Sequence, residues 1–129
     1  MSETIFESGV IYINGAEFSK IADIAWQNHS KFSGVFIKNL FGAKESDKRL
    51  SVAIVKVEPN CEIGEHFHEG EAELHEVIFG KGRATIENAS VEYKAGVVSL
   101  IPAKVIHSVK AGDSGLILLA KFAPVRELK

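Results

Sequence analysis

Residues 64–80 read GEHFHEGEAELHEVIFG, and the first ten of them hold two histidines and four glutamates in a chain with only five histidines in all. In a β-strand, side chains at positions i and i+2 point to the same face. His66 and His68 are therefore expected to project together, with their Cα atoms about 6.6–6.8 Å apart. Two imidazoles placed in this way can converge on one ion.

The segment that follows adds two more polar side chains to this region. It begins a predicted strand at Glu73, and alternation places His75, Val77 and Phe79 on the same face as Glu73. A carboxylate and a third imidazole therefore join the side chains that are expected to point inward.

A further histidine lies in a separate apolar run, Val105-Ile106-His107-Ser108-Val109. Because Val105 and Val109 share the face of His107, this histidine is expected to point to the apolar side of its strand. Taken alone, such a residue is more often a hydrogen-bonded core histidine than a metal ligand. The other histidines favour the ligand interpretation.

Runs typical of β-strands recur after residue 34, with Gly, Pro and Asn between them. They cover residues 34–40, 50–57, 74–79, 83–87, 91–94, 97–101, 105–109 and 115–123. Strands at intervals of about eight to twelve residues indicate an all-β sandwich or barrel. We expect one β-domain over residues 34–129, preceded by an N-terminal segment over residues 1–33.

The N-terminal segment carries a different pattern. Residues 17–29, EFSKIADIAWQNH, place apolar side chains at helical spacing, which predicts a short amphipathic helix or helical turn. The apolar positions are Phe18, Ile21, Ala22, Ala25 and Trp26. They would cover one end of the barrel or a neighbouring subunit, and the pattern does not decide between these two.

Length and composition exclude several classes of protein. The 129 residues suffice for one hydrophobic core, and 46% apolar with 25% charged residues is the balance of a globular domain. A net charge of −2 gives no reason to expect nucleic acid or an anionic membrane as a partner. The N-terminus lacks the pattern of a signal peptide and no apolar run is long enough for a membrane span, so we expect a cytoplasmic protein. The lone Cys61 agrees with a reducing compartment.

The spacing of these residues resembles the two motifs of the cupin superfamily. His66-x-His68, four residues, Glu73, six residues and Gly80 are similar to the first motif. Gly96, Pro102 and His107 follow at the intervals of the second motif. The resemblance implies a small jelly-roll barrel, the double-stranded β-helix. Together with the pattern of residues 17–29, this predicts an all-β barrel with a short N-terminal helical segment.

The resemblance also implies a metal centre. His66, His68, Glu73 and His107 would bind one divalent transition metal per chain. Three imidazoles and one carboxylate suit Mn, Fe, Co, Ni, Cu or Zn better than Ca or Mg. An octahedral ion held by four protein ligands would keep two positions open for water, dioxygen or a substrate.

The roles of Glu71 and His75 also need an assignment. The family spacing tolerates one residue fewer after His68, which makes Glu71 a rival to Glu73, but only Glu73 keeps the six-residue interval to Gly80. His75 is either a group behind the ligands that orients one of them or moves a proton, or a hydrogen-bonded core histidine. Glu73 and His75 are the candidate catalytic residues.

Three positions depart from the family pattern. Asn60 and Lys104 stand where the motifs usually have Gly, and Ala111 stands where the second motif usually closes with Asn. Asn is the residue after Gly that best tolerates a left-handed turn. None of the three supplies a ligand, so the departures concern turn geometry and local hydrogen bonds.

Three functions are compatible with this pattern, because cupins host many activities. The first is a metal-dependent enzyme, dioxygenase- or isomerase-like, that acts on a small oxygen-rich organic molecule. The second is a non-catalytic domain that binds or senses a small ligand through the metal. The third is a sugar-modifying cupin with a His and Tyr acid/base pair, for which Tyr12 and Tyr93 are the available tyrosines. The resemblance also implies a homodimer.

Overall fold

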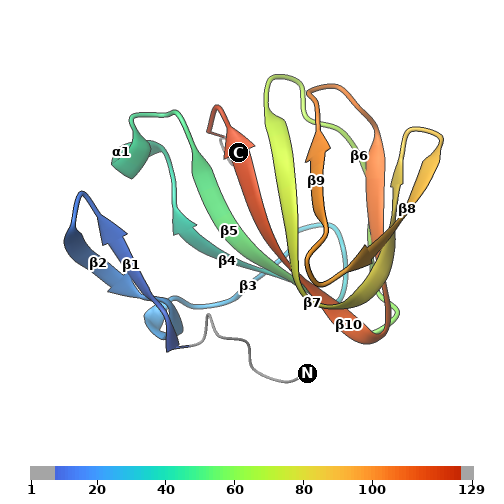
Figure 1. The fold of residues 1–129 in the computed structure, drawn as a ribbon, viewed down its shortest axis with the longest axis horizontal. Coiled ribbons are helices and arrows are strands. Elements are labelled where there is room, and N and C mark those ends of the chain that lie inside the picture. The colour runs from blue at the N-terminus through green and yellow to red at the C-terminus, as the bar shows by residue number, and fades with distance from the viewer. Residues whose placement is uncertain (1–7, 126–129) are drawn as a thin grey trace.

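Strands make up most of the chain in a computed structural model that describes residues 8–125 (Figure 1). The strands are β1 Val10–Ile13, β2 Ala16–Lys20, β3 Gln27–Asn28, β4 Val35–Phe41, β5 Ser51–Val57, β6 Glu62–His66, β7 Ala72–Ile86, β8 Ala89–Lys94, β9 Val98–Ile101 and β10 His107–Ala123. A 3-10 turn covers Ile21–Asp23, and the short helix α1 covers Ala43–Ser46.

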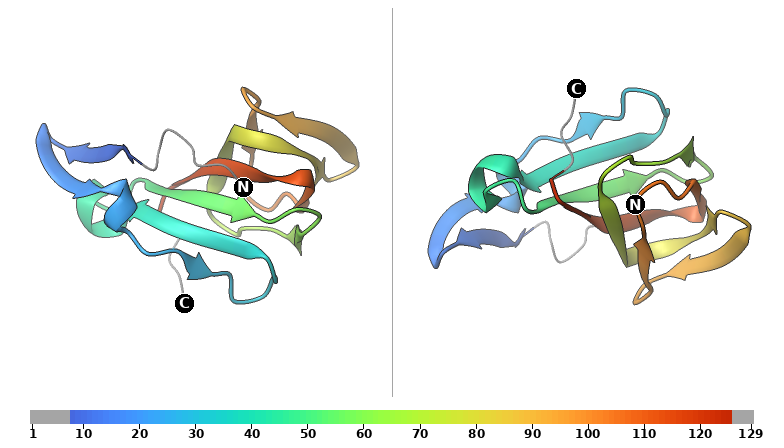
Figure 2. Two further views of the ribbon diagram at one scale, coloured as in Figure 1. Left: turned by 90° about the horizontal axis from the view of Figure 1, so that it is seen from below. Right: turned by 90° about the horizontal axis from the view of Figure 1, so that it is seen from above.

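Two long strands, β7 and β10, connect the two layers of the barrel. The first part of β10 pairs with β6 and with the end of β7, whereas its second part pairs with β5 and with the start of β7. The remaining strands β3, β4, β8 and β9 extend these layers, and all pairings are antiparallel. Figures 1 and 2 show the resulting sheet folded over on itself.

Glycines occupy the point where the long strands change layers. The pairing between β10 and β7 is interrupted between Ala111 and Leu116, opposite Gly82 and Gly80. Gly80 has a φ of +87°, and a Cβ atom there would collide with the carbonyl oxygen of Gly115. Only glycine allows both this backbone conformation and this close approach.

Two hydrophobic clusters stabilise the layers. The inner cluster fills the barrel with the buried residues Val35, Val55, Val57, Ile63, Val77, Ala84, Tyr93, Val109, Ala111, Leu116, Leu118 and Ala120. The outer cluster contains Ile11, Ile21, Leu40, Val52, Ile54 and Ile117, with Trp26 and Phe79 among the residues packed against it. The hairpin β1–β2 therefore packs against the barrel of its own chain.

The all-β jelly-roll fold is confirmed, and the predicted strands are found with two mergers. The runs 74–79 and 83–87 belong to the single strand β7, and the runs 105–109 and 115–123 belong to β10. The division into residues 1–33 and 34–129 stays a prediction. Within the part of the chain that the structure describes, no helix has the length and apolar character needed to cross a membrane.

Of the short helix or helical turn predicted over residues 17–29, the structure contains only the 3-10 turn Ile21–Asp23. Residues Ala16–Lys20 form β2, which pairs with β1 through a two-residue loop. That loop is Asn14-Gly15, and both residues have positive φ, which is the requirement of a type I′ hairpin turn. The Asn-Gly pair was the sequence signal for this hairpin, but the apolar residues at helical spacing favoured a helical assignment instead. Phe18 is consequently exposed.

The predicted shared face of β7 is correct at Glu73, His75 and Val77 and wrong at Phe79. The pairing with β10 is irregular between Val77 and Phe79, so Ile78 is an extra residue in β7. Such a bulge shifts the alternation by one position. Phe79 consequently packs on the outer cluster, while Val77 belongs to the inner one.

Replacing Gly80 tests the strand crossing. We expect Gly80→Ala to lower the free energy of unfolding by roughly 2–5 kcal/mol, because left-handed strain and a backbone collision act together. Gly96→Ala is the matched control, since Gly96 has a φ of +97° but open space around its Cβ position. Urea unfolding monitored by circular dichroism gives both values. Equal losses for the two variants would contradict the role of the close approach.

Candidate metal centre

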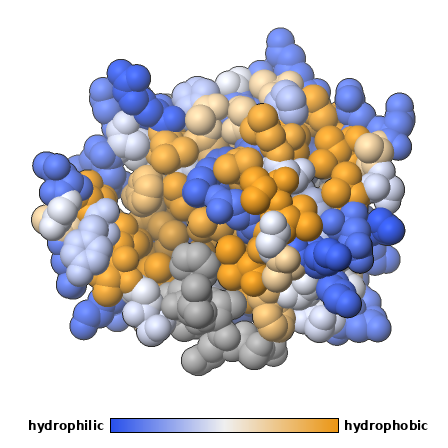
Figure 3. Space-filling view, in the orientation of Figure 1, coloured by the Kyte–Doolittle hydropathy of each residue, from blue (hydrophilic) through white to orange (hydrophobic). Residues whose placement is uncertain are grey.

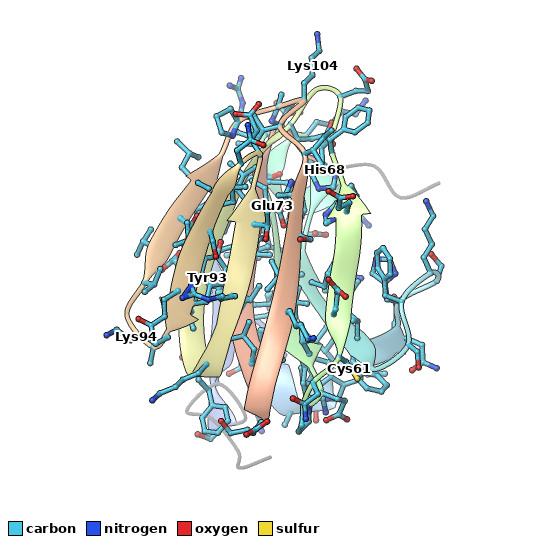
Figure 4. All side chains as sticks on the ribbon, turned by 90° about the vertical axis from the view of Figure 1, so that its right-hand side faces the viewer. Cys61, His68, Glu73, Tyr93, Lys94 and Lys104 are labelled. Carbon is cyan, nitrogen blue, oxygen red and sulfur yellow. The ribbon has the colours of Figure 1, made fainter. Side chains whose placement is uncertain are left out.

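Four side chains from three strands and one loop meet near one end of the barrel. His66 ends β6, His68 lies in the loop after it, Glu73 is the second residue of β7 and His107 is the first of β10. One ligand atom from each lies within 4.8 Å of the others. Figure 4 shows His68 and Glu73 near this end and Cys61 near the opposite end, so the thiol is remote from the cluster.

Strand pairing and one turn bring these residues together. His66 and His107 are direct cross-strand partners of β6 and β10. The loop residue His68 is fixed by its backbone carbonyl, which accepts a hydrogen bond of 2.7 Å from the Lys104 N–H. Its ring also packs edge-on against Phe122, with ring centroids 5.1 Å apart.

The departures from the motif pattern keep the turn conformations that the motifs need. Asn60 has a φ of +62° and Lys104 a φ of +71°, so both adopt the left-handed conformation without being glycine. Ala111 is buried, and its N–H donates to the carbonyl of Cys61. The turn at Lys104 therefore holds the His68 loop despite the strain of a left-handed lysine.

Backbone carbonyls orient two of the imidazoles. Nδ1 of His66 lies 2.7 Å from the carbonyl oxygen of Gly64, and Nδ1 of His107 lies 2.9 Å from that of Val105. A carbonyl only accepts hydrogen bonds, so each Nδ1 carries the proton. In the neutral ring, Nε2 then offers its lone pair to the cluster, which is the tautomer that a metal requires.

Glu73 lies at the centre of the cluster. Its Oε1 is 3.2 Å from Nε2 of His68 and 3.0 Å from Nε2 of His107. Because Nδ1 of His107 already carries the proton, its Nε2 and the carboxylate Oε1 of Glu73 both present lone pairs. Two such atoms stay in contact only when a proton or a metal ion lies between them. Metal–ligand bonds of about 2.1 Å at right angles separate two ligand atoms by about 3.0 Å. The donor types and their separations thus fit a transition metal.

The environment keeps two of these groups in the protonation states that a metal needs. Burial by itself raises the pKa of Glu73, but the neighbouring imidazoles of His107, His68 and His75 outweigh this effect and hold the pKa well below its usual value. Burial lowers the pKa of His66 to about 4, and the bond to Gly64 offsets only part of this effect. Glu73 is therefore ionised and His66 neutral at pH 7.

His75 lies behind Glu73 rather than among the four clustered atoms. Its Nε2 is 2.8 Å from Oε2 of Glu73, and its Nδ1 is 2.9 Å from the hydroxyl of Tyr93. Burial raises the pKa of Tyr93; a hydrogen bond from Ser99 acts against this, and the negative charge of Glu73 adds to it. The structure thus joins His75 to Tyr93 inside the barrel, whereas Tyr12 is exposed.

The structure separates Glu73 from its rival and adds aromatic neighbours that the sequence did not reveal. Glu71 is not part of the cluster. Of the clustered residues only His66 is partly exposed, and the ring of Phe32 lies 6.4 Å from it between centroids. Phe32 and His29 line a pocket of about 260 Å³ over residues 28–36. No local pattern marks Phe32, because it lies in a loop and reaches the site only through the fold.

Comparison with known proteins identifies the family. The model of the cupin domain family matches residues 53–120, just over half of the chain. The chain belongs to this family. No curated protein matches at a significant level.

Solved cupin structures agree with the fold. A predicted oxalate decarboxylase from Thermotoga maritima is 25% identical, with 81% of this chain and 96% of that chain covered and a TM-score of 0.75. KdgF from Halomonas sp. is 19% identical over 81% of this chain and 92% of that one, with a TM-score of 0.73. An RmlC-like cupin from Shewanella frigidimarina is 21% identical over 85% and 92%, with a TM-score of 0.74. The last two show the fold alone.

The low pKa of His66 predicts a pH dependence of stability. The unfolded chain protonates His66 below pH 6.5, but the folded chain does so only near pH 4. The contribution of neutral His66 is fully present above pH 6.5 and declines as the pH falls through this window. With a chelator present, His66→Gln should therefore lose less unfolding free energy than the wild type between pH 7 and pH 5. Urea unfolding at pH 7 and pH 5 measures this loss for both proteins. Identical losses in the variant and the wild type would contradict the lowered pKa of His66.

Proposed function

We propose that this cupin binds one divalent transition metal through His66, His68, Glu73 and His107 and acts as an enzyme on a small oxygen-rich organic molecule. The observation that carries the proposal is the approach of four ligand atoms to within 4.8 Å of one another. Three of the four residues are buried, and burying so many polar groups is costly unless each is satisfied. A bound ion would satisfy all four at once.

The site residues divide the chemical tasks. A metal of this kind supplies a Lewis acid or an oxygen-activating centre for dioxygenase- or isomerase-like chemistry. The partly exposed His66 and the neighbouring Phe32 mark the side from which a substrate would approach. Glu73 is the candidate catalytic residue that faces this centre, whereas His75 contacts only its far oxygen and could move a proton to the site through Glu73.

The substrate class has support from one relative. The similar structure from Thermotoga maritima is described as a predicted oxalate decarboxylase. Oxalate is small and rich in oxygen, and molecules of this kind can bind a metal through two oxygens. A screen of small hydroxy, keto and dicarboxylic acids with the metal-loaded protein tests for turnover. Binding that depends on the metal, without product from any compound, would favour the non-catalytic binding domain.

Metal analysis distinguishes the two candidate carboxylates. Protein purified without an affinity tag should contain about one transition-metal ion per chain by elemental analysis. Glu73→Ala, His66→Ala and His107→Ala should lower this content to near zero, because each removes a ligand atom. Glu71→Ala is the matched control and should keep the wild-type content, since its carboxylate lies outside the cluster.

The opposite result for the two glutamates would show that Glu71 is the ligand. Wild-type protein without metal, even after reconstitution with Mn, Fe, Co, Ni, Cu and Zn in turn, would overturn the proposed centre. Circular dichroism of each variant verifies that a lost metal reflects a lost ligand rather than an unfolded chain.

We also propose that the chain forms a homodimer through the outer face of β9. Val98 and Leu100 on this strand are 64% and 65% exposed, and Leu74 of β7 lies directly beside Leu100. Figure 3 shows apolar side chains gathered over the middle of this face. Exposed apolar patches of this kind often mark protein contacts.

The mass in solution tests the dimer. Light scattering coupled to size-exclusion chromatography should give twice the chain mass of 14.1 kDa. Leu100→Lys should shift the mass toward the monomer, because it places a charge in the apolar contact. A wild-type monomer at about 100 µM, well above the dissociation constant of a stable dimer, would contradict the proposal.

A further inference from the structure

A chain of buried polar groups leads from the candidate metal centre into the barrel. The carboxylate of Glu73 is followed by His75 at 2.8 Å and by the Tyr93 hydroxyl at 2.9 Å. The exposed fractions of the three residues are 6%, 2% and 0%. Three strands contribute to its surroundings, because β7 carries Glu73 and His75, β8 carries Tyr93, and β9 pairs with β7 opposite His75.

The hydrogen bonds of this chain have a fixed direction. An ionised carboxylate only accepts, so Nε2 of His75 carries the proton that is donated to Glu73. In the neutral ring Nδ1 then accepts from the Tyr93 hydroxyl. His75 is thus held in the tautomer opposite to that of His66 and His107, whose Nδ1 atoms donate to backbone carbonyls. The four-residue cluster presents lone pairs, whereas His75 presents an N–H.

The two carboxylate oxygens of Glu73 therefore have different surroundings. Oε1 faces the Nε2 atoms of His68 and His107, and Oε2 faces the donor on His75. A carboxylate whose second oxygen accepts a strong hydrogen bond has less tendency to bind an ion through both oxygens. The direction of this bond thus decides how many positions on an ion Glu73 would occupy.

We propose that His75, held by Tyr93, is a positioning residue that restricts Glu73 to one-oxygen ligation through Oε1. This inference rests on the proposed metal centre. Limiting Glu73 to one position keeps a further position on the ion available to a substrate. The tyrosine has a part in this role, because its hydroxyl fixes the orientation and the tautomer of the imidazole.

Packing alone does not account for the pair. His75 and Tyr93 lie beside the apolar residues of the inner cluster, to which Tyr93 itself belongs. Their rings meet edge to face with centroids 5.7 Å apart, a contact that two apolar aromatic rings would make equally well. Burial of an imidazole and a phenol hydroxyl costs free energy unless both are hydrogen bonded. The polar atoms therefore point to a task at Glu73.

Cobalt(II) binding tests the proposal with a readout that needs no activity. The full-length protein and its variants are titrated with Co(II) against a chromophoric chelator, and the visible absorption of the bound ion is recorded. His75→Leu should weaken binding about 10- to 100-fold, the range seen for loss of groups that orient ligands. Its spectrum should also change, because Oε2 becomes free to bind the ion.

Conservative variants separate positioning from folding. His75→Gln keeps a donor near the position of Nε2 and should stay within about three-fold of the wild type, as a retained hydrogen bond requires. Tyr93→Phe removes one hydroxyl and should weaken binding by several-fold, with a spectral change in the same direction as His75→Leu. Tyr12→Phe is the matched control for this change, since Tyr12 is 63% exposed, and it should have no effect.

The outcomes separate this inference from the metal centre itself. If the wild type binds no Co(II), the proposed centre fails and the role of His75 fails with it. Suppose instead that the wild type binds Co(II) and that Tyr93→Phe, His75→Gln and a folded His75→Leu all match its affinity and spectrum. Only the positioning role is then overturned, and the metal centre stands. Should His75→Leu not fold, an unchanged affinity and spectrum in Tyr93→Phe overturns the role.

Discussion

The buried carboxylate of Glu73 is the group around which the interior of this barrel is arranged. An ionised carboxylate loses several kcal/mol of hydration when it is buried, and that loss must be offset by hydrogen bonds or by a cation. His75 donates a hydrogen bond to one oxygen of Glu73, and the Nε2 atoms of His68 and His107 lie around the other oxygen, where a cation would fit. No strand could supply all of these partners alone, so the charge is stable only when β6, β7 and β10 are assembled.

The two long strands make this assembly possible, because each belongs to both layers of the sheet. Glu73 near the start of β7 pairs with Phe122, and His107 at the start of β10 pairs with Ile86, so the two residues are not strand partners. They come within 3.0 Å of each other because both strands cross from one layer to the other. The crossing at Gly80 and Gly115 sets how closely the layers approach. A change at that crossing would therefore be transmitted to the site through the strands rather than through the ligands.

The sequence predicted the parts of this structure that depend on local periodicity and on motif spacing. The strands, the jelly roll and the inward direction of Glu73 and His75 follow from alternation, and the spacing of two motifs brought His107 into the same cluster. The N-terminal segment was misassigned because five apolar residues at helical spacing outweighed one Asn-Gly turn. The bulge at Ile78 and the bond between His75 and Tyr93 depend on how β7 pairs with β8, β9 and β10, which no local pattern records.

The residues of the cluster differ in their exposure to solvent, and this difference bears on the chemistry that the site could support. His68, Glu73 and His107 are buried, while His66 at the end of β6 is partly exposed beside Phe32. The inner side of Glu73 is closed by His75 and Tyr93, so the cluster is more accessible on the side of His66. Burial on the closed side strengthens the hydrogen bonds that fix the carboxylate, because the local dielectric constant is low. On the other side, the neutral imidazole of His66 is partly exposed to solvent. A site that holds a bound ion firmly needs a rigid side from which water is excluded. A site that also exchanges a small ligand needs an accessible side next to it, and this cluster has both.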